Sequence, residues 1–374
     1  MKPLLPRQKG RICFITETDL ESRHITGAIT NDIKMLRLME KYGVVNVVHL
    51  QKEKYRFIFA YLPIYILQIL RSLLAPYQIY FTRSIIASFM LTSFRSFNRK
   101  NAKIVHQAFS VPLMSSEIKY LGFNVVESFV RLILYNFFEK KALPKVDFIT
   151  VAAEEYAEAL IKVGIKRSKI HVVHFYVEDA FFEQPVKNIG SIFSVCYVGG
   201  FHSYHSLLPL IEAFELVGKT EENVNLLLVG VGPQRPKLEK EVEGRKLTEK
   251  VKFLGGFPHS FLPSFLASVD CFVSLIPKSG ISISLLEAAA SAKVIIAFTP
   301  DDVVNRYFTQ GESIYLLNRL APNEIANAIK TINENSKLKD TLAKGARETA
   351  RRYFSEEVAS RQLQTLISKI YEND

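Results

Sequence analysis

Two glycine-containing segments in the second half of the chain could bind an anion. Gly199 and Gly200 follow the apolar run FSVCYV, and Gly230 and Gly232 follow the run NVNLLLV. Glycine allows a backbone to approach a ligand closely, and ligands of parallel sheets bind at the carboxyl ends of strands. A helical pattern comes after each segment, and the first N–H groups of a helix favour a phosphate.

A third segment, SGISISLLEAAA, combines a turn of the same kind with a carboxylate. Gly280 and Ser282 open a predicted helix, and Glu287 lies one to two turns into it. A carboxylate can accept hydrogen bonds from the hydroxyl groups of a ribose. The segment therefore predicts a nucleotide diphosphate site around Glu287, although a lone glutamate on a helix is more often an ordinary solvent-facing residue.

These segments need a frame of strands and helices, and the sequence predicts one. Short apolar runs alternate with helical patterns along the chain, which is typical of α/β layers on parallel sheets. Strands are expected at 11–16, 44–50, 78–84, 102–108, 147–152, 169–175, 193–198, 223–229, 251–255, 270–275, 293–298 and 313–317. Helices are expected at 28–42, 115–141, 206–217 and 283–290, and over most of the chain after 322.

The chain of 374 residues is long enough for two domains with full cores. The stretch at 183–191 contains Pro185, Gly190 and several polar residues, follows a complete strand–helix series and is typical of a linker. We expect a first domain at 1–187 and a second at 188–354, followed by a helical segment at 355–374.

The composition indicates a globular protein of a reducing compartment. Hydrophobic residues make up 48% of the chain and charged residues 23%, which excludes a disordered chain. Cys13, Cys196 and Cys271 lie inside predicted strands, at spacings that fit neither a disulfide framework nor a zinc site. The first residues carry prolines and charges where a secretory leader would have its apolar core. The expected location is the cytoplasm.

The formal net charge of +11 comes from the first half of the chain. Residues 1–190 hold 27 Lys and Arg against 16 Asp and Glu, whereas the remainder holds 21 of each. Basic residues at 52–103 alternate with aromatic and aliphatic ones, as in KYRFIFAYLPIYILQILRSLL. This mixture favours an anionic membrane surface as a partner over nucleic acid, because the sequence contains no nucleic-acid recognition module. A peripheral position on the inner face of the membrane is therefore the alternative location.

Residues 57–74 leave three interpretations open. The apolar stretch is at the lower limit for crossing a membrane, and Pro63, Gln68 and Arg71 interrupt it. The second interpretation is a helix that lies at the membrane interface or faces an acceptor. The third is a helix of the protein core, and the whole basic stretch would then be a core with a solvated rim.

The order of motifs from 193 to 298 resembles the donor-binding domain of glycosyltransferase family 4, the retaining group 1 glycosyltransferases. The family pattern reads here as YVGG…LIEAF, LLLVGVGP, VKFLGG, DCFVSL and SGISISLLEAAASAKVIIAF, in the same order and at matching spacings. Several ordered matches are far more specific than any one of them. KIVHQAF and the region from FEKKALPKVDFITV to YVEDAFF match the first domain of the family more loosely.

The resemblance implies the α/β GT-B fold, in which two Rossmann-like domains face each other across a cleft and the terminal helix returns to the first domain. It implies that a sugar moves, with retention, from a nucleotide diphosphate sugar to an acceptor that is lipid-linked or displayed at a membrane. Neither a cofactor nor a catalytic metal is expected. The implied catalytic residues are His106 and Glu287. The implied donor-binding residues are Gly27, Gly199, Gly200, His205, Gly230, Gly232, Gly256, Ser279, Gly280, Ile281, Ser282, Ser284, Leu285 and Glu287.

The chain departs from the family pattern at the sugar and phosphate sites. The family has two glutamates separated by seven residues. Glu287 matches the second, and Ser279 stands in place of the first. The usual phosphate-binding Arg and Lys fall at Gly200 and His205, where Tyr204 with His205 resembles a tyrosine–histidine variant. The main alternative is therefore a catalytically silent protein of this fold, which binds a nucleotide or scaffolds a partner glycosyltransferase.

Other functions fit the sequence less well. The histidine pairs at 171–174 and 202–205 suggest a metal site, but a spacing of three residues on a strand places the two rings on opposite faces. His106 could be a buried histidine at the end of a strand. A phosphorylase would need a longer chain. A nicotinamide dehydrogenase would need the G-x-G-x-x-G motif after a strand, followed by an acidic residue.

Overall fold

The computed structural model describes most of the chain and divides it into two compact units. The described residues are 10–18, 20, 27–49, 58–97, 102–108, 136–184, 192–202, 207–275, 280–300 and 303–372. Unit 1 comprises Met1–Phe175 and Ala359–Asp374, and unit 2 comprises Tyr176–Val358. The first boundary falls earlier than the expected one after residue 187. Most of the linker expected at 183–191, from residue 185 on, lies outside the described residues.

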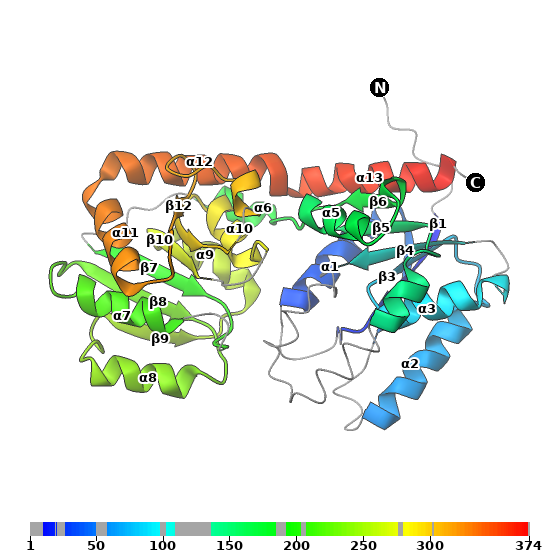
Figure 1. Ribbon diagram of the computed structural model, residues 1–374, viewed down its shortest axis with the longest axis horizontal. Coiled ribbons are helices and arrows are strands. Elements are labelled where there is room, and N and C mark those ends of the chain that lie inside the picture. Colours follow the sequence, from blue (N-terminus) through cyan, green and yellow to red (C-terminus); the bar gives the residue numbers. More distant parts are fainter. Residues whose placement is uncertain are drawn as a thin grey trace. The chain divides into compact units, whose positions relative to one another are not determined.

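Unit 1 is built on a parallel six-stranded sheet with the strand order β2-β1-β3-β4-β5-β6 (Figure 1). Its strands are β1 (Gly10–Thr16), β2 (Gly43–His49), β3 (Ile79–Thr82), β4 (Lys103–Ala108), β5 (Phe148–Val151) and β6 (Ile170–Val172). Its helices are α1 (Gly27–Glu40), α2 (Ile58–Ser72), α3 (Ile85–Ser93), the short η1 (Arg95–Phe97), α5 (Glu154–Lys162) and most of α13 (Glu356–Glu372). The strands predicted for this half are confirmed. Of the helix expected at 115–141, only its last residues, from 136, are described, and they are helical.

The α2 helix buries one side and exposes part of the other. Tyr65 and Ile69 lie four residues apart on the helix and are buried, as the helical period requires. Leu67, between them in sequence, is 45% exposed, and Pro63 is exposed as well. Within the described ranges, no helix combines the length and the apolar character that a membrane crossing needs. The core interpretation therefore holds for one face of α2, while the other face leaves apolar surface in contact with solvent.

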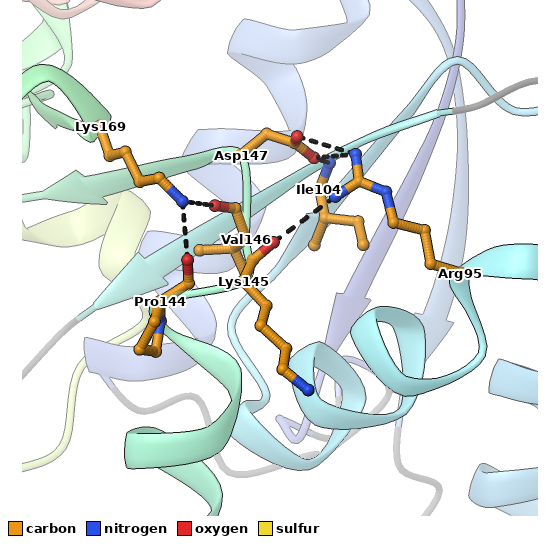
Figure 2. A network of polar contacts seen from close by, with 7 residues as sticks. All are labelled: Arg95, Ile104, Pro144, Lys145, Val146, Asp147 and Lys169. Carbon is orange, nitrogen blue, oxygen red and sulfur yellow. Dashed lines mark hydrogen bonds and ion pairs between the residues drawn. The ribbon is translucent and has the colours of Figure 1, made fainter.

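An ion pair fixes the segment after α3 to the sheet of unit 1 (Figure 2). The guanidinium of Arg95 donates to both carboxylate oxygens of Asp147, at 2.8 and 2.9 Å, and one of these oxygens also accepts the N–H of Ile104 at 2.8 Å. The Lys169 ammonium donates to two carbonyl oxygens of the neighbouring turn at 2.8 Å each. Arg95 belongs to the basic stretch at 52–103, but its charge is paired inside the unit.

Unit 2 is built on a second parallel six-stranded sheet, with the order β12-β11-β10-β7-β8-β9. Its strands are β7 (Phe193–Val198), β8 (Val224–Val229), β9 (Val251–Gly255), β10 (Cys271–Leu275), β11 (Val294–Phe298) and β12 (Tyr315–Leu316). Its helices are α6 (Asp179–Glu183), α7 (Leu207–Val217), α8 (Arg235–Gly244), α9 (Leu262–Ala267), α10 (Ile283–Ala290), α11 (Pro322–Glu334) and α12 (Ser336–Phe354). The strands and helices predicted here are confirmed.

The strand order of unit 2 determines where a ligand can bind. The chain starts in the middle of the sheet with β7, builds outward through β8 and β9, and returns to the other side of β7 with β10. This is the Rossmann order, whose crevice lies at the carboxyl ends of the two strands where the direction reverses. In unit 2 these strands are β7 and β10.

Alternate residues of the strands hold the sheet of unit 2 against α7 and α11. Val195, Leu226, Val273 and Ile296 come from four neighbouring strands and are completely buried in one cluster with Phe214 of α7. On the other side of the sheet, α10 packs against α12 (Figure 1). Both faces of the sheet are thus covered, and only its edges are left to carry a site.

Candidate functional site

Backbone hydrogen bonds join the loops after β7, β8 and β9. The N–H of Gly199 donates to the carbonyl oxygen of Val229 at 3.0 Å, and the N–H of Gly230 donates to that of Gly255 at 2.7 Å. The ring of Phe201 is completely buried and anchors the first loop to the core. The three loops therefore form one surface at the carboxyl edge of the sheet.

Gly230 and Gly232 are required by the packing of these loops. Their φ angles are +147° and +159°, in the region that side chains rarely adopt. A Cβ built on Gly230 would overlap the carbonyl oxygen of Gly199, and one built on Gly232 would lie 2.6 Å from the nitrogen of Phe201. Both glycines were predicted to bind a donor, and the structure adds that they let one loop lie directly on the other.

The α10 helix begins with a side-chain cap. Gly280 has a φ of +115°, which suits the turn before the helix. The hydroxyl oxygen of Ser282 then accepts the N–H of Leu285 at 3.1 Å. Ser282 and Leu285, both predicted to bind a donor, form this cap and so hold the start of α10.

Glu287 is buried. Its side chain is 3% exposed, and its Oε1 accepts a hydrogen bond from Nε2 of His259 at 2.7 Å. The other nitrogen of that ring, Nδ1, lies 3.5 Å from Oε2 of Glu178. The solvent-facing interpretation of Glu287 is therefore wrong: the carboxylate is inside unit 2 and has a defined polar partner.

His106 lies on β4 of unit 1. Its side chain is 5% exposed, and its Nδ1 is 2.9 Å from the hydroxyl oxygen of Ser88 on α3. Burial lowers the pKa of His106 to about 4, because the low-dielectric interior disfavours the charged ring. The ring is therefore neutral at pH 7.

A buried polar network lies at the carboxyl ends of β1 and β3. Asp32 of α1 forms an ion pair with Arg83, and its Oδ2 accepts the hydroxyl hydrogen of Thr16 at 2.7 Å. Close by, the Ser84 hydroxyl donates to Glu17 at 2.5 Å. In the strand order of unit 1 this is the point where the direction of building reverses, so the network holds the position where ligands of open sheets bind.

Three other predicted site residues are glycines. Gly27 begins α1. Gly256 follows β9, and a Cβ built on it would lie 3.6 Å from a methyl group of Val231, which is an ordinary contact. Gly200 lies under the ring of His202, whose nearest atom would be 2.6 Å from a Cβ. The predicted residues His205 and Ser279 lie outside the described residues, as does Tyr204.

Sequence reasoning did not find His259, Glu178 or Phe201. His259 follows the β9 strand in the stretch GFPHS, so its place after a strand end was a signal, but nothing local ties it to a helix 28 residues later. Glu178 is far from His259 in the sequence, in the short segment that precedes β7.

A family comparison matches unit 2. Residues 181–349 match the family described as "Glycosyl transferases group 1". A curated relative is the alpha-monoglucosyldiacylglycerol synthase of Acholeplasma laidlawii, which is 25% identical over 162 residues. That match covers 43% of this chain and only 39% of the relative, so the chain spans less than half of that protein's length.

Two solved structures share the fold of nearly the whole chain. The HepE protein of Anabaena, determined in complex with UDP, is 16% identical and has a TM-score of 0.73, covering 96% of this chain and 100% of that one. The sucrose-phosphate synthase of Thermosynechococcus elongatus is 19% identical and has a TM-score of 0.75, with 98% and 100% covered. The expected α/β fold of two Rossmann-like units, the GT-B class, is confirmed. Residues 181–349, which lie in unit 2, therefore match the group 1 glycosyl transferases in sequence.

Proposed function

We propose that the protein transfers a sugar from a nucleotide diphosphate sugar to an acceptor, with UDP as the diphosphate. The observation that carries this proposal is the buried carboxylate of Glu287 on a helix that starts at the strand-order reversal of a Rossmann sheet. The presence of UDP in the HepE structure supports the choice of base. The match to the group 1 family supports transfer over other reactions of nucleotide sugars.

Each part of the site has a chemical role in this proposal. The Glu287 carboxylate accepts hydrogen bonds from the ribose hydroxyls and so positions the nucleotide. The first N–H groups of α10 and the backbone of the loop after Val198 face the diphosphate. They stabilise the negative charge that develops on the leaving group, which is electrostatic catalysis. We also propose retention at the anomeric carbon, independence from metal and a catalytic role for His106.

A silent nucleotide-binding protein is the second candidate, because Ser279 and Gly200 stand where the family has charged residues. The two candidates share the nucleotide site and differ in turnover. A silent protein would bind UDP and UDP-sugars without cleaving them, whereas a transferase releases UDP from its donor, slowly even when only water is the acceptor.

Replacing Glu287 with glutamine is expected to weaken UDP binding at least about tenfold. The substitution keeps the size of the side chain but removes the charge, and a hydrogen bond to a charged group contributes about 1.5–3 kcal/mol. Titration calorimetry with UDP measures the binding, and release of UDP from UDP-sugars measures turnover. Glu249→Gln is the control, since this glutamate is 94% exposed. The proposal is wrong if the unchanged protein binds no nucleotide diphosphate.

We further propose that the acceptor is presented at a membrane surface and that unit 1 contacts this surface. Apolar side chains are exposed on three neighbouring segments: Leu74 after α2 (61%), Phe97 of η1 (62%) and Phe137 (50%). The α2 and α3 helices contact each other, and Phe137 lies beside Phe89 of α3. Exposed basic residues lie on the same segments, namely Arg71, Lys140 and Lys141. Basic and apolar groups side by side suit an interface with anionic lipids. A glycolipid synthase among the relatives supports this partner.

Replacing both Lys140 and Lys141 with glutamine is expected to weaken binding to vesicles that contain anionic lipids. Each basic residue near such a surface contributes about 1 kcal/mol, so the double substitution should cost about thirtyfold in affinity. Co-sedimentation with phosphatidylglycerol vesicles at low salt measures this. The matched control replaces Lys237 and Lys240, two exposed lysines of α8 in unit 2. Arg95 is unsuitable as a target, because its loss would break the Asp147 pair. Equal losses in both double variants would remove the case for a surface on unit 1.

A further inference from the structure

His259 lies between two carboxylates that come from different parts of unit 2. Its Nε2 is 2.7 Å from Oε1 of Glu287, and its Nδ1 is 3.5 Å from Oε2 of Glu178. A carboxylate only accepts hydrogen bonds, so Nε2 must carry the hydrogen of the shorter contact. The other ring nitrogen, Nδ1, faces the carboxylate of Glu178.

The position of the ring is fixed from several sides. His259 begins the short turn His259–Phe261 after β9, and the N–H of Phe261 closes this turn on the carbonyl oxygen of Pro258 at 2.9 Å. The ring of Phe181, on α6, lies 5.6 Å from the imidazole. The imidazole is 26% exposed, whereas Glu287 is 3% exposed, so the histidine is the more accessible of the two side chains.

We propose that His259 is a positioning residue for Glu287, and that Glu178 in turn orients His259. This inference rests on the proposed role of Glu287 in binding ribose. A hydrogen bond to Oε1 fixes the rotation of the carboxylate about its last bond before any nucleotide arrives. Binding then costs less ordering of side chains, which is how a preorganised site gains affinity. The benefit applies to the ribose hydroxyls, because they are the groups that Glu287 would contact.

This chemistry predicts a signature that differs from simple structural support. If His259 only stabilised the fold around β9, its loss would weaken all nucleotides by the same factor. If it positions Glu287, its loss weakens UDP much more than an analogue without the ribose hydroxyl. The ratio of the dissociation constants of deoxy-UDP and UDP is therefore the quantity to measure.

The experiment titrates the full chain with UDP, 2′-deoxy-UDP and 3′-deoxy-UDP by calorimetry. We expect the unchanged protein to prefer UDP over one of the deoxy analogues by at least about tenfold, the size of a charged hydrogen bond. In His259→Ala this preference should fall to about twofold or less, with most of the loss in UDP binding. His259→Gln can still place an N–H near Glu287 and should retain most of the preference. Glu178→Gln should lie between the two.

Two further variants separate the possible failures. Glu287→Ala must abolish the preference for UDP; if it does not, the proposed ribose role of Glu287 is wrong. Phe261→Ala changes an exposed ring of the same turn (64% exposed) and should leave the preference intact. The positioning role of His259 is refuted if Glu287→Ala abolishes the preference while His259→Ala keeps it. It is also refuted if His259→Ala weakens the binding of all three ligands equally. In both cases the proposed function stands.

Discussion

Replacing Gly230 with alanine is expected to destabilise unit 2 by about 2–6 kcal/mol. Two costs add here. A residue with a side chain held at a φ of +147° carries strain of about 1–3 kcal/mol. The new Cβ would also overlap the carbonyl oxygen of Gly199, and forcing extra volume into a packed site costs about 1–3 kcal/mol more.

The overlap cannot be relieved by a rotating side chain, because the obstructing atom belongs to the backbone. The loop after β7 would have to move away, and the hydrogen bond from Gly199 to Val229 would be lost with it. Nucleotide binding should therefore fail in Gly230→Ala even under conditions where the unit stays folded.

Gly244 offers the matched control. It ends α8, and a Cβ built there meets no atom within 4 Å. Gly244→Ala should be neutral or slightly stabilising, since alanine favours a helix by up to about 1 kcal/mol over glycine. Urea denaturation, followed in unit 2 by hydrogen exchange, compares the two variants. Similar stability of both would show that the loop after β7 adapts to the added methyl group.

The strands and helices could be predicted from the sequence because their signals are local. A buried parallel strand is a short apolar run between turn residues, and DCFVSL before the β10–α10 turn is an example. The loops predicted to bind a ligand also follow from local signals, since glycine directly after a strand marks them. The location of Glu287 at the right end of the sheet was predictable for the same reason.

What was not predictable depends on contacts between distant residues. Glu287 was expected to meet a ligand, but its contact with His259 exists only because the β9 turn and α10 lie together in the folded unit. Gly230 was predicted to lie in a turn, but its packing against Gly199 exists only because the two loops are adjacent in the folded unit. Arg95 was predicted to contribute to a basic surface, because the sequence alone does not reveal that it binds Asp147. The type of a single residue indicates which chemistry it can perform, whereas the residues that it contacts are known only from the fold.

The stability of unit 1 is expected to fall as the pH is lowered from about 6.5 towards 4. Burial lowers the pKa of His106 to about 4, while an unfolded histidine titrates near 6.5. Between these values the unfolded state binds one proton more than the folded state. The free energy of unfolding therefore decreases by about 1.4 kcal/mol per pH unit for this residue, or about 3 kcal/mol over the whole window. Above about pH 6.5 the contribution is complete.

Two other histidines of unit 1 act in the same direction. Burial lowers the pKa of His171 to about 4, with the nearby charge of Lys369 as a smaller cause, and burial also lowers the pKa of His174. The acid sensitivity should thus belong to unit 1. Hydrogen exchange in urea can be read separately in peptides from β4 and from β10, which makes unit 2 an internal reference.

His106→Gln isolates the contribution of one ring. Glutamine does not titrate, so the slope of the unfolding free energy of unit 1 between pH 6.5 and 5 should decrease by about 1.4 kcal/mol per pH unit. The measurement stays above pH 5 because carboxylates begin to be protonated below it. His49→Gln, which replaces a partly exposed histidine of β2, is the matched control. An unchanged slope in His106→Gln would mean that the ring takes up its proton in the folded unit as readily as in the unfolded chain, which would contradict its burial away from water.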